Sequence, residues 1–155
     1  MTRILRLLGA LAFVACTCPA ALAQEVRLRV MTFNVVYDWP DDAPNRWALR
    51  KEAVAKMIQA SGAAIVCIQE DKEDQVADLE RRLEGWVFHG RGRNANGSGE
   101  RCSIAWRAEH VRAKEQGEFW LSDTPDVPGS NTWGDEYPRK CTWATRWATR
   151  ESIVS

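Results

Sequence analysis

Residues 28–34 (LRVMTFN) and 65–70 (IVCIQE) decide the fold. Each is a short apolar run that ends in a polar side chain, Asn34 in the first and Glu70 in the second. Such runs are typical of buried strands, and we expect strands over residues 26–36 and 63–68, the first buried on both faces. Between them, apolar side chains recur at helical spacing from Trp47 to Ser61.

Strand, helix and strand in this order predict a βαβ unit, whose two strands normally run parallel. Gly62 stands where a helix C-terminus favours glycine, and Asn45 is the expected cap at the N-terminus of the helix. Ligands of open α/β sheets gather outside the carboxyl ends of parallel strands. Asn34 and Glu70 are therefore expected to point into one cleft.

The rest of the chain alternates short strand-like runs with loops, and one domain is the simplest count. Loop 38–45 is rich in Asp and Pro, loop 90–99 in Gly, and loop 122–138 in Pro, Asp, Gly and Asn. The further elements predicted are a helix over 72–83 and strands over 86–89, 102–106, 116–121 and 141–147. The eight tryptophans mostly fall on helix or strand positions, which favours core packing over a sugar-binding surface.

Residues 1–23 have the pattern of a signal peptide. Two arginines precede the apolar run 7–14, and Ala21-Leu22-Ala23 supplies the small residues that a signal peptidase reads, so the mature domain is predicted to cover 24–155. The run is too short to span a bilayer, so no stable membrane insertion is expected. We predict a secreted or periplasmic protein, with a lipoprotein anchored at Cys16 as the alternative.

Charge and cysteine content restrict the function classes. The whole chain has 21 basic and 21 acidic residues, and the leader contains two of the basic ones, which leaves the mature part at −2. Such a chain lacks the broad basic surface of a nonspecific nucleic-acid binder. Cys67, Cys102 and Cys141 are expected to be buried thiols, although one disulfide plus a free thiol is the alternative.

Oxygen-bearing side chains at one sheet edge suit a hard cation. Mg²⁺ takes about six oxygen ligands and needs only one or two protein carboxylates. Glu70 supplies a charged oxygen donor and Asn34 a neutral carbonyl. On the residues alone, a glutamate at a strand end is more often solvated surface than a metal ligand.

Five segments in order resemble the endonuclease/exonuclease/phosphatase family, and its secreted bacterial members in particular. They are residues 28–34, 37–47 (YDWPDDAPNRW), 65–70, 119–130 (FWLSDTPDVPGS) and 138–143 (PRKCTW). The resemblance runs from about Leu28 to Trp147. It implies an α/β (α+β) fold, the N-terminal half of a four-layer α/β sandwich in which two packed β-sheets are flanked by helices.

The resemblance also implies site residues and a cofactor. Asn34 matches the family's active-site Asn, and Glu70 matches its metal-ligand Glu, so both are expected at a Mg²⁺ or Mn²⁺ site. Glu100 precedes a strand that enters the cleft in relatives, and Arg139 is a candidate donor to a phosphate. A solvated loop arginine is the competing interpretation for Arg139.

Three functional hypotheses follow. The first is a metal-dependent hydrolase of phosphate esters, acting on a nucleic acid or a phosphorylated small molecule. The family's Asn-Thr-His, Gly-Asp-Phe-Asn and Ser-Asp-His segments do not occur in this sequence, so we expect the chain to be incomplete and weakly active or inactive. The second is a secreted, non-catalytic binding protein that keeps part of the fold. The third is a half-sandwich whose uncovered apolar sheet face prevents stable folding.

Overall fold

The computed structural model describes residues 27–148. The predicted signal peptide, the predicted mature start at Gln24 and the alternative anchor at Cys16 lie outside the described residues. Within 27–148, no helix is long and apolar enough to cross a membrane. The three cysteines of this part are free, as expected, but they are half-buried rather than buried.

The predicted βαβ unit is present. Strand β1 (Val30–Asn34) pairs in parallel with β2 (Ile65–Gln69), with Asn34 opposite Gln69. Helix α1 (Trp47–Ser61) forms the crossover, and Gly62 ends it in the left-handed conformation at a φ of 64°. This register places the carboxyl ends of β1 and β2 side by side.

Two further strands complete the first sheet. Strand β4 (Ile104–Arg107) runs antiparallel to β2, and β3 (Trp86–His89) lies antiparallel at the edge beyond β4. The strand order is therefore β1-β2-β4-β3. Helix α2 (Glu73–Glu80) links β2 to β3.

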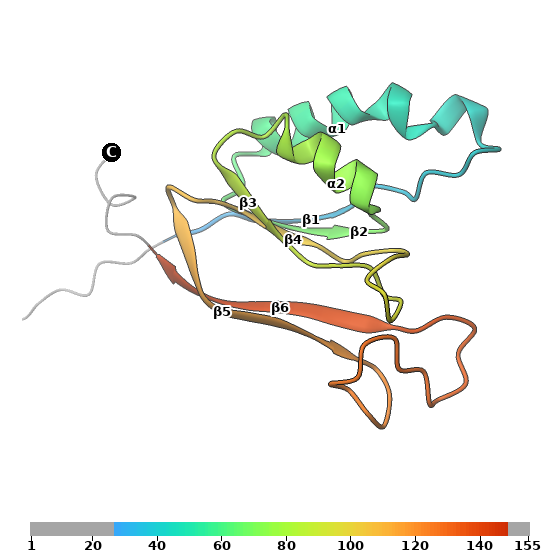
Figure 1. The fold of residues 1–155 in the computed structure, drawn as a ribbon. Helices are drawn as coiled ribbons and strands as arrows, with labels where there is room; N and C mark the ends of the chain where they lie inside the picture. Colours follow the sequence, from blue (N-terminus) through green and yellow to red (C-terminus); the bar gives the residue numbers. More distant parts are fainter. Residues whose placement is uncertain (1–26, 149–155) are drawn as a thin grey trace, which may run out of the picture.

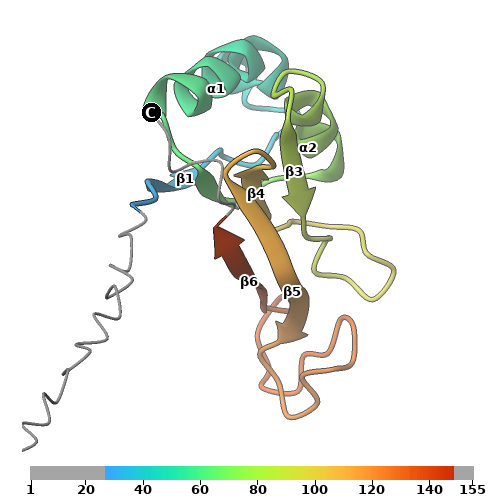
Figure 2. The same ribbon diagram turned by 90° about the vertical axis from the view of Figure 1, so that its left-hand side faces the viewer.

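A long hairpin forms the second sheet. Strand β5 (Val111–Trp120) pairs antiparallel with β6 (Lys140–Ala148), and loop 121–139 joins them. Helices α1 and α2 cover one face of the four-stranded sheet and the hairpin lies along the other face (Figures 1 and 2). The expected mixed α/β architecture with two packed sheets is confirmed.

The apolar core has a part on each side of the first sheet. On the helical side, Ile58, Val66, Ile68 and Leu79 are almost wholly buried. On the hairpin side, Ala64, Trp106 and Val111 form a smaller cluster. Central strand β2 thus contributes to both parts, as a continuous apolar run predicts.

Several element boundaries differ from the sequence expectation. Strand β1 is shorter than 26–36 and is not buried on both faces, because it is an edge strand whose residues alternate between exposed and half-buried. It cannot extend through Val36, whose φ of 60° breaks the extended backbone. Helix α2 ends at Glu80, before Leu83, which still packs in the core. Strand β5 starts five residues earlier than predicted because β6 pairs along its whole length.

The predicted helix cap is wrong. Asn45 lies in the short 3-10 helix η1 (Ala43–Asn45), and α1 begins at Trp47 without a cap from the preceding side chain. Instead, Oδ1 of Asp38 accepts a hydrogen bond from the Trp47 N–H at 2.7 Å. The cap comes from nine residues upstream, so a local sequence pattern does not reveal it.

Candidate active site

Asn34 and Glu70 meet at the shared edge of β1 and β2. Nδ2 of Asn34 donates a hydrogen bond to Oε1 of Glu70 at 2.8 Å. Oδ1 of Asn34 accepts one from the Val36 N–H at 2.9 Å. These two contacts fix the orientation of the amide, because the flipped amide would set oxygen against oxygen. Asn34 thus holds the Glu70 carboxylate in place.

The backbone on both sides of this pair is strained. Glu70 has a φ of 57° and Val36 a φ of 60°, and they are the non-glycine residues with positive φ in the described chain. Such conformations cost on the order of 1–3 kcal/mol and persist only where surrounding contacts impose them. They gather at ligand sites more often than elsewhere, which makes this edge a candidate site.

Side chains from both helices impose the conformation at Val36. The buried Gln75 on α2 donates from Nε2 to the Val36 carbonyl at 3.1 Å. Arg50 on α1 donates to the carbonyls of Val35 and Val36, at 2.5 and 3.1 Å. The segment that follows Asn34 is therefore held by the scaffold.

Asp38 continues this anchoring. Its two carboxylate oxygens accept hydrogen bonds from Nε and Nη2 of Arg46, both at 3.0 Å, in addition to the cap on Trp47. The Arg46 hydrogen bond, followed by the one from the Trp47 N–H, lowers the pKa of Asp38 to about 2. Asp38 is thus charged at neutral pH and joins its loop to the start of α1.

A pocket of about 460 Å³ opens at the Glu70 carboxylate. Its charged lining consists of Glu70, Glu100, Arg93 and Arg139. Its aromatic lining consists of Tyr37, Trp39 and Tyr137. These residues come from the loops 35–46, 90–103 and 121–139 and from the end of β2, which gather at one end of the molecule (Figure 1).

The two arginines of the pocket differ in their partners. Arg93 forms an ion pair with Glu100 at 2.7 Å and lies over the Tyr137 ring at 4.5 Å. Arg139 is exposed and forms no ion pair with any residue of the described segment 27–148. Its planar guanidinium is therefore the more accessible donor for an anion.

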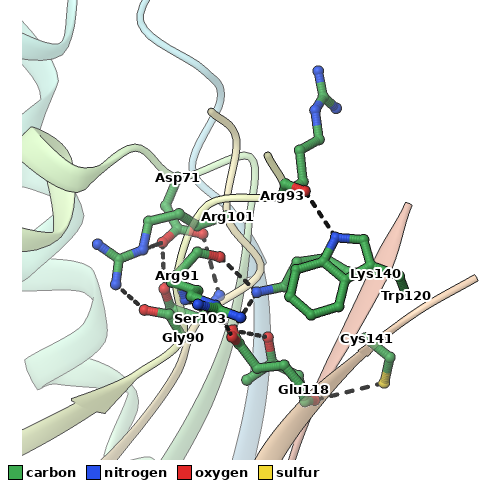
Figure 3. A network of polar contacts seen from close by, with 11 residues as sticks. Asp71, Gly90, Arg91, Arg93, Arg101, Ser103, Glu118, Trp120, Lys140 and Cys141 are labelled. Carbon is green, nitrogen blue, oxygen red and sulfur yellow. Dashed lines mark hydrogen bonds and ion pairs between the residues drawn. The ribbon is translucent and has the colours of Figure 1, made fainter. Parts of the chain in front are cut away.

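A buried charge network holds the loop that contributes Arg93 and Glu100 (Figure 3). Lys140 has 2% of its side chain exposed and pairs with Glu118 on the neighbouring strand. Glu118 also accepts from the Arg91 N–H and side chain, at 2.8 and 2.9 Å. Burial acts to raise the pKa of Glu118, but the bonds from Lys140 and Arg91 hold it below its ordinary value. The loop is thereby attached to the hairpin.

A second buried contact fixes the other end of the same loop. Asp71, next to Glu70, is fully buried and accepts a 2.5 Å hydrogen bond from the Ser103 hydroxyl. Arg101 lies 4.0 Å from the Asp71 carboxylate and bridges toward the Gly90 carbonyl (Figure 3). Desolvation raises the pKa of Asp71, and the hydrogen bonds from Ser103 oppose that shift.

The structure brings together most of the predicted site residues. Glu70, Glu100 and Arg139 line one pocket, and Asn34 contacts Glu70 behind it. Sequence reasoning missed Arg93 and the three aromatic residues as pocket residues. Trp47, Trp106 and Trp120 are buried as predicted, but Trp143 on β6 is 38% exposed, against the expectation of core packing. Trp39, in the predicted loop 38–45, is 61% exposed. The sequence signal that could have indicated an exposed aromatic residue was the position of Trp39 within a segment dense in Asp and Pro.

The donor set at this edge fits a hard cation. No group of three or more His, Cys, Asp and Glu side chains is arranged for a metal within residues 27–148. Mg²⁺, however, needs only one or two carboxylates and keeps several waters. Glu70 supplies one carboxylate and Glu100 stands in the same pocket. Asn34 donates from Nδ2 to this carboxylate and accepts the Val36 N–H at Oδ1, so it positions the carboxylate. Its role as a metal ligand stays a prediction.

Comparison with known proteins gives matches among solved structures. No protein-family model matches the chain, and no curated protein matches it. An endonuclease/exonuclease/phosphatase family protein from Bacteroides thetaiotaomicron superposes with a TM-score of 0.75 at 31% identity, over 81% of this chain and 45% of that one. One from Bacteroides vulgatus gives a TM-score of 0.75 at 32% identity, over 78% and 47%.

A third matched structure has a stated activity. The mannosyl-6-phosphatase of Bacteroides thetaiotaomicron VPI-5482 superposes with a TM-score of 0.74 at 32% identity, over 79% of this chain and 46% of that one. The present chain thus spans less than half the length of the solved structures that it matches.

Proposed function

Because this chain belongs, over the part that matches, to the endonuclease/exonuclease/phosphatase family, we propose that it forms part of the active site of a phosphate-ester hydrolase. The observation that carries the proposal is the 2.8 Å contact between Asn34 and Glu70 at the carboxyl ends of adjacent parallel strands. This pair opens into a pocket with two arginines, and such a pocket suits a phosphate group.

In this proposal, each residue of the candidate site has a distinct role. The Glu70 carboxylate binds the cation, and Asn34 keeps its Oε1 in a fixed position. A bound Mg²⁺ or Mn²⁺ supplies Lewis-acid polarisation of a phosphoryl oxygen. Arg139 donates to the phosphate, and Glu100 orients Arg93 through their 2.7 Å ion pair.

The substrate that we propose is a small phosphorylated molecule. Residues 24–155, the predicted mature part, have a net charge of −2, which favours a small substrate over a polynucleotide backbone. A pocket of about 460 Å³ is of the size that binds a small ligand. One matched protein is a mannosyl-6-phosphatase, which makes a sugar phosphate one candidate substrate for this chain.

The test is the effect of Glu70→Gln on metal binding by the full chain. We expect the dissociation constant for Mn²⁺, followed by electron paramagnetic resonance, to rise at least about tenfold, because the charged ligand is lost. Glu84→Gln, an exposed site outside the pocket, is the matched control and should bind as the parent does. Equal Mn²⁺ affinity in the Glu70→Gln chain contradicts the proposal.

An assay of phosphate-ester hydrolysis is a second test of the proposal. Because the family's Asn-Thr-His, Gly-Asp-Phe-Asn and Ser-Asp-His segments do not occur in this sequence, we expect the chain alone to release little or no phosphate from p-nitrophenyl phosphate. Any residual release should require Mg²⁺ or Mn²⁺ and should fall in the Glu70→Gln variant. The non-catalytic alternative instead predicts saturable ligand binding that a chelator leaves unchanged. Measuring binding of inorganic phosphate with and without EDTA therefore separates the two functions.

A further inference from the structure

The pocket has an exposed aromatic side that the proposed phosphate chemistry does not use. Trp39 is 61% exposed and Tyr137 is 45% exposed, and both line the pocket with Tyr37. The Tyr37 and Trp39 rings lie 5.2 Å apart between centroids, at 51°. Exposed aromatic surface grouped at a polar pocket is typical of a ligand-binding surface.

Contacts with neighbouring residues hold the segment that contains Tyr37 and Trp39 in a fixed position. Nζ of Lys72, the N-cap residue of α2, lies 3.8 Å from the centroid of the Tyr37 ring and donates to the Asp38 carbonyl at 3.4 Å. Asp38, between the two aromatic residues, is fixed by Arg46 and by the N-terminus of α1. An aromatic side chain on a segment held this firmly loses little conformational entropy when a ligand stacks on it.

Of the three aromatic rings in the pocket, that of Trp39 is the one available for a ligand to stack on. Arg93 already lies over Tyr137, and Lys72 lies over Tyr37. Trp39, the most exposed of the three, has no cation over its ring among the described residues. It stands in the same pocket as Glu70, Glu100 and Arg139, so a phosphate bound there would bring its attached group near the indole.

We propose that Trp39 is a specificity-determining residue that stacks against the ring of the group esterified to the phosphate. This inference rests on the proposed phosphoesterase function. The ligand chemistry is a phosphorylated ring with one apolar face, which both a sugar and a nucleoside provide. A flexible acyclic phosphate lacks that face and gains nothing from the indole. Stacking on an aromatic side chain is tolerant of the ring's identity, because it uses a face rather than a hydrogen-bond pattern.

Calorimetric titration of the full chain tests the proposal. The probes are glucose 6-phosphate, AMP, glycerol 3-phosphate and inorganic phosphate, each with Mn²⁺ present. We expect at least one ring phosphate to bind at least about fivefold more tightly than glycerol 3-phosphate, the low end of a measured stacking contribution. The preferred ring distinguishes a sugar from a nucleoside as its source.

Two tryptophan variants make the test specific. Trp39→Ala should reduce the ring preference to within about twofold, and Trp39→Phe should restore part of it. Trp133→Ala is the matched control, because Trp133 is 59% exposed in loop 121–139 but does not line the pocket. It should leave the preference unchanged. Both alanine variants remove an exposed side chain, and thermal unfolding checks that each is folded.

Two results would overturn the inference, and they are distinguishable. If inorganic phosphate and glycerol 3-phosphate bind but the ring phosphates show no advantage, or keep it in Trp39→Ala, the aromatic role is wrong and the phosphate site stands. If no probe binds to the parent chain, the proposed phosphoesterase site fails as well, and the inference falls with it.

Discussion

Glu70 and Val36 show how single residues shape the candidate site. Both have a positive φ, which residues other than glycine rarely adopt. At Glu70 this turn ends β2 and directs the carboxylate back to Asn34, at 2.8 Å. At Val36 it turns the chain out of β1 into the loop that contains Tyr37 and Trp39. Hydrogen bonds from Gln75 and Arg50 to the Val36 carbonyl offset the strain at Val36, so the fold imposes this backbone conformation.

Asp38 provides a prediction at the same scale. Replacing it by alanine removes the cap of α1 and the paired hydrogen bonds with Arg46, so the free energy of unfolding at pH 7 should fall by about 1–2 kcal/mol. Urea unfolding measures the loss. Asp126→Ala, at an exposed loop position, should change stability by less than about 0.5 kcal/mol.

The pH dependence of that loss follows from the pKa of Asp38. The folded-state pKa of Asp38 is lowered to about 2 from the ordinary value of 3.8. A lowered carboxyl pKa stabilises the fold above the unfolded-state pKa, and the contribution is lost as pH falls through the folded-state value. The difference between parent and Asp38→Ala should therefore be constant above about pH 5 and shrink between about pH 4 and 2. A difference that grows on acidification would contradict the assignment.

At the scale of elements, the hairpin and the loop 90–101 are joined by a buried ion pair. Lys140 and Glu118 have 2% and 10% of their side chains exposed, and Lys140 also donates to the Arg91 carbonyl at 2.6 Å. Trp120 adds a hydrogen bond from Nε1 to the Arg93 carbonyl at 2.8 Å. The ion pair and Trp120 thus together support the backbone on both sides of Gly92, next to the pocket.

Breaking this pair should be costly. Lys140→Met leaves the buried Glu118 carboxylate without its ammonium partner, and removal of one member of a buried pair typically costs about 3–5 kcal/mol. Chemical denaturation should show a loss of at least about 2 kcal/mol, since Arg91 still contacts Glu118. Lys56→Met, exposed on α1, is the control and should stay within about 0.5 kcal/mol.

The double variant Glu118→Met with Lys140→Met refines the interpretation. Replacing both charged partners by apolar side chains should recover part of the loss, because no unpaired carboxylate remains buried. A single variant as stable as the parent would mean that the ion pair does not hold the loop.

Elements were predictable from sequence where periodicity and end signals act locally. The helix from Trp47 to Ser61, its stop at Gly62 and the parallel pairing of β1 with β2 agree with the prediction. The cap from Asp38 and the pocket positions of Arg93 and Tyr137 depend on contacts between distant segments. Loops without a period carry no local signal for such contacts, so side-chain geometry was needed to find them.

At the scale of the whole molecule, the hairpin covers part of the sheet face that the sequence left in question. Trp106 and Val111 are 6% and 3% exposed between the two sheets. Ile65 and Ile104 remain half-buried there, beside an apolar cavity of about 140 Å³. The expectation of a wholly uncovered apolar face is therefore too strong for the described residues, although the packing between the sheets is thinner than that beneath the helices.

Val111 tests whether this contact contributes to the stability of the molecule. Val111→Ala removes two buried methyl groups at the edge of an existing cavity, so the free energy of unfolding should fall by about 1–2 kcal/mol. Val127→Ala makes the same chemical change at a site that is 53% exposed and should be nearly neutral. Urea denaturation of both variants measures the difference. If they are equally stable, the hairpin contributes little to the core, and the helices and the four-stranded sheet alone determine the stability of the protein.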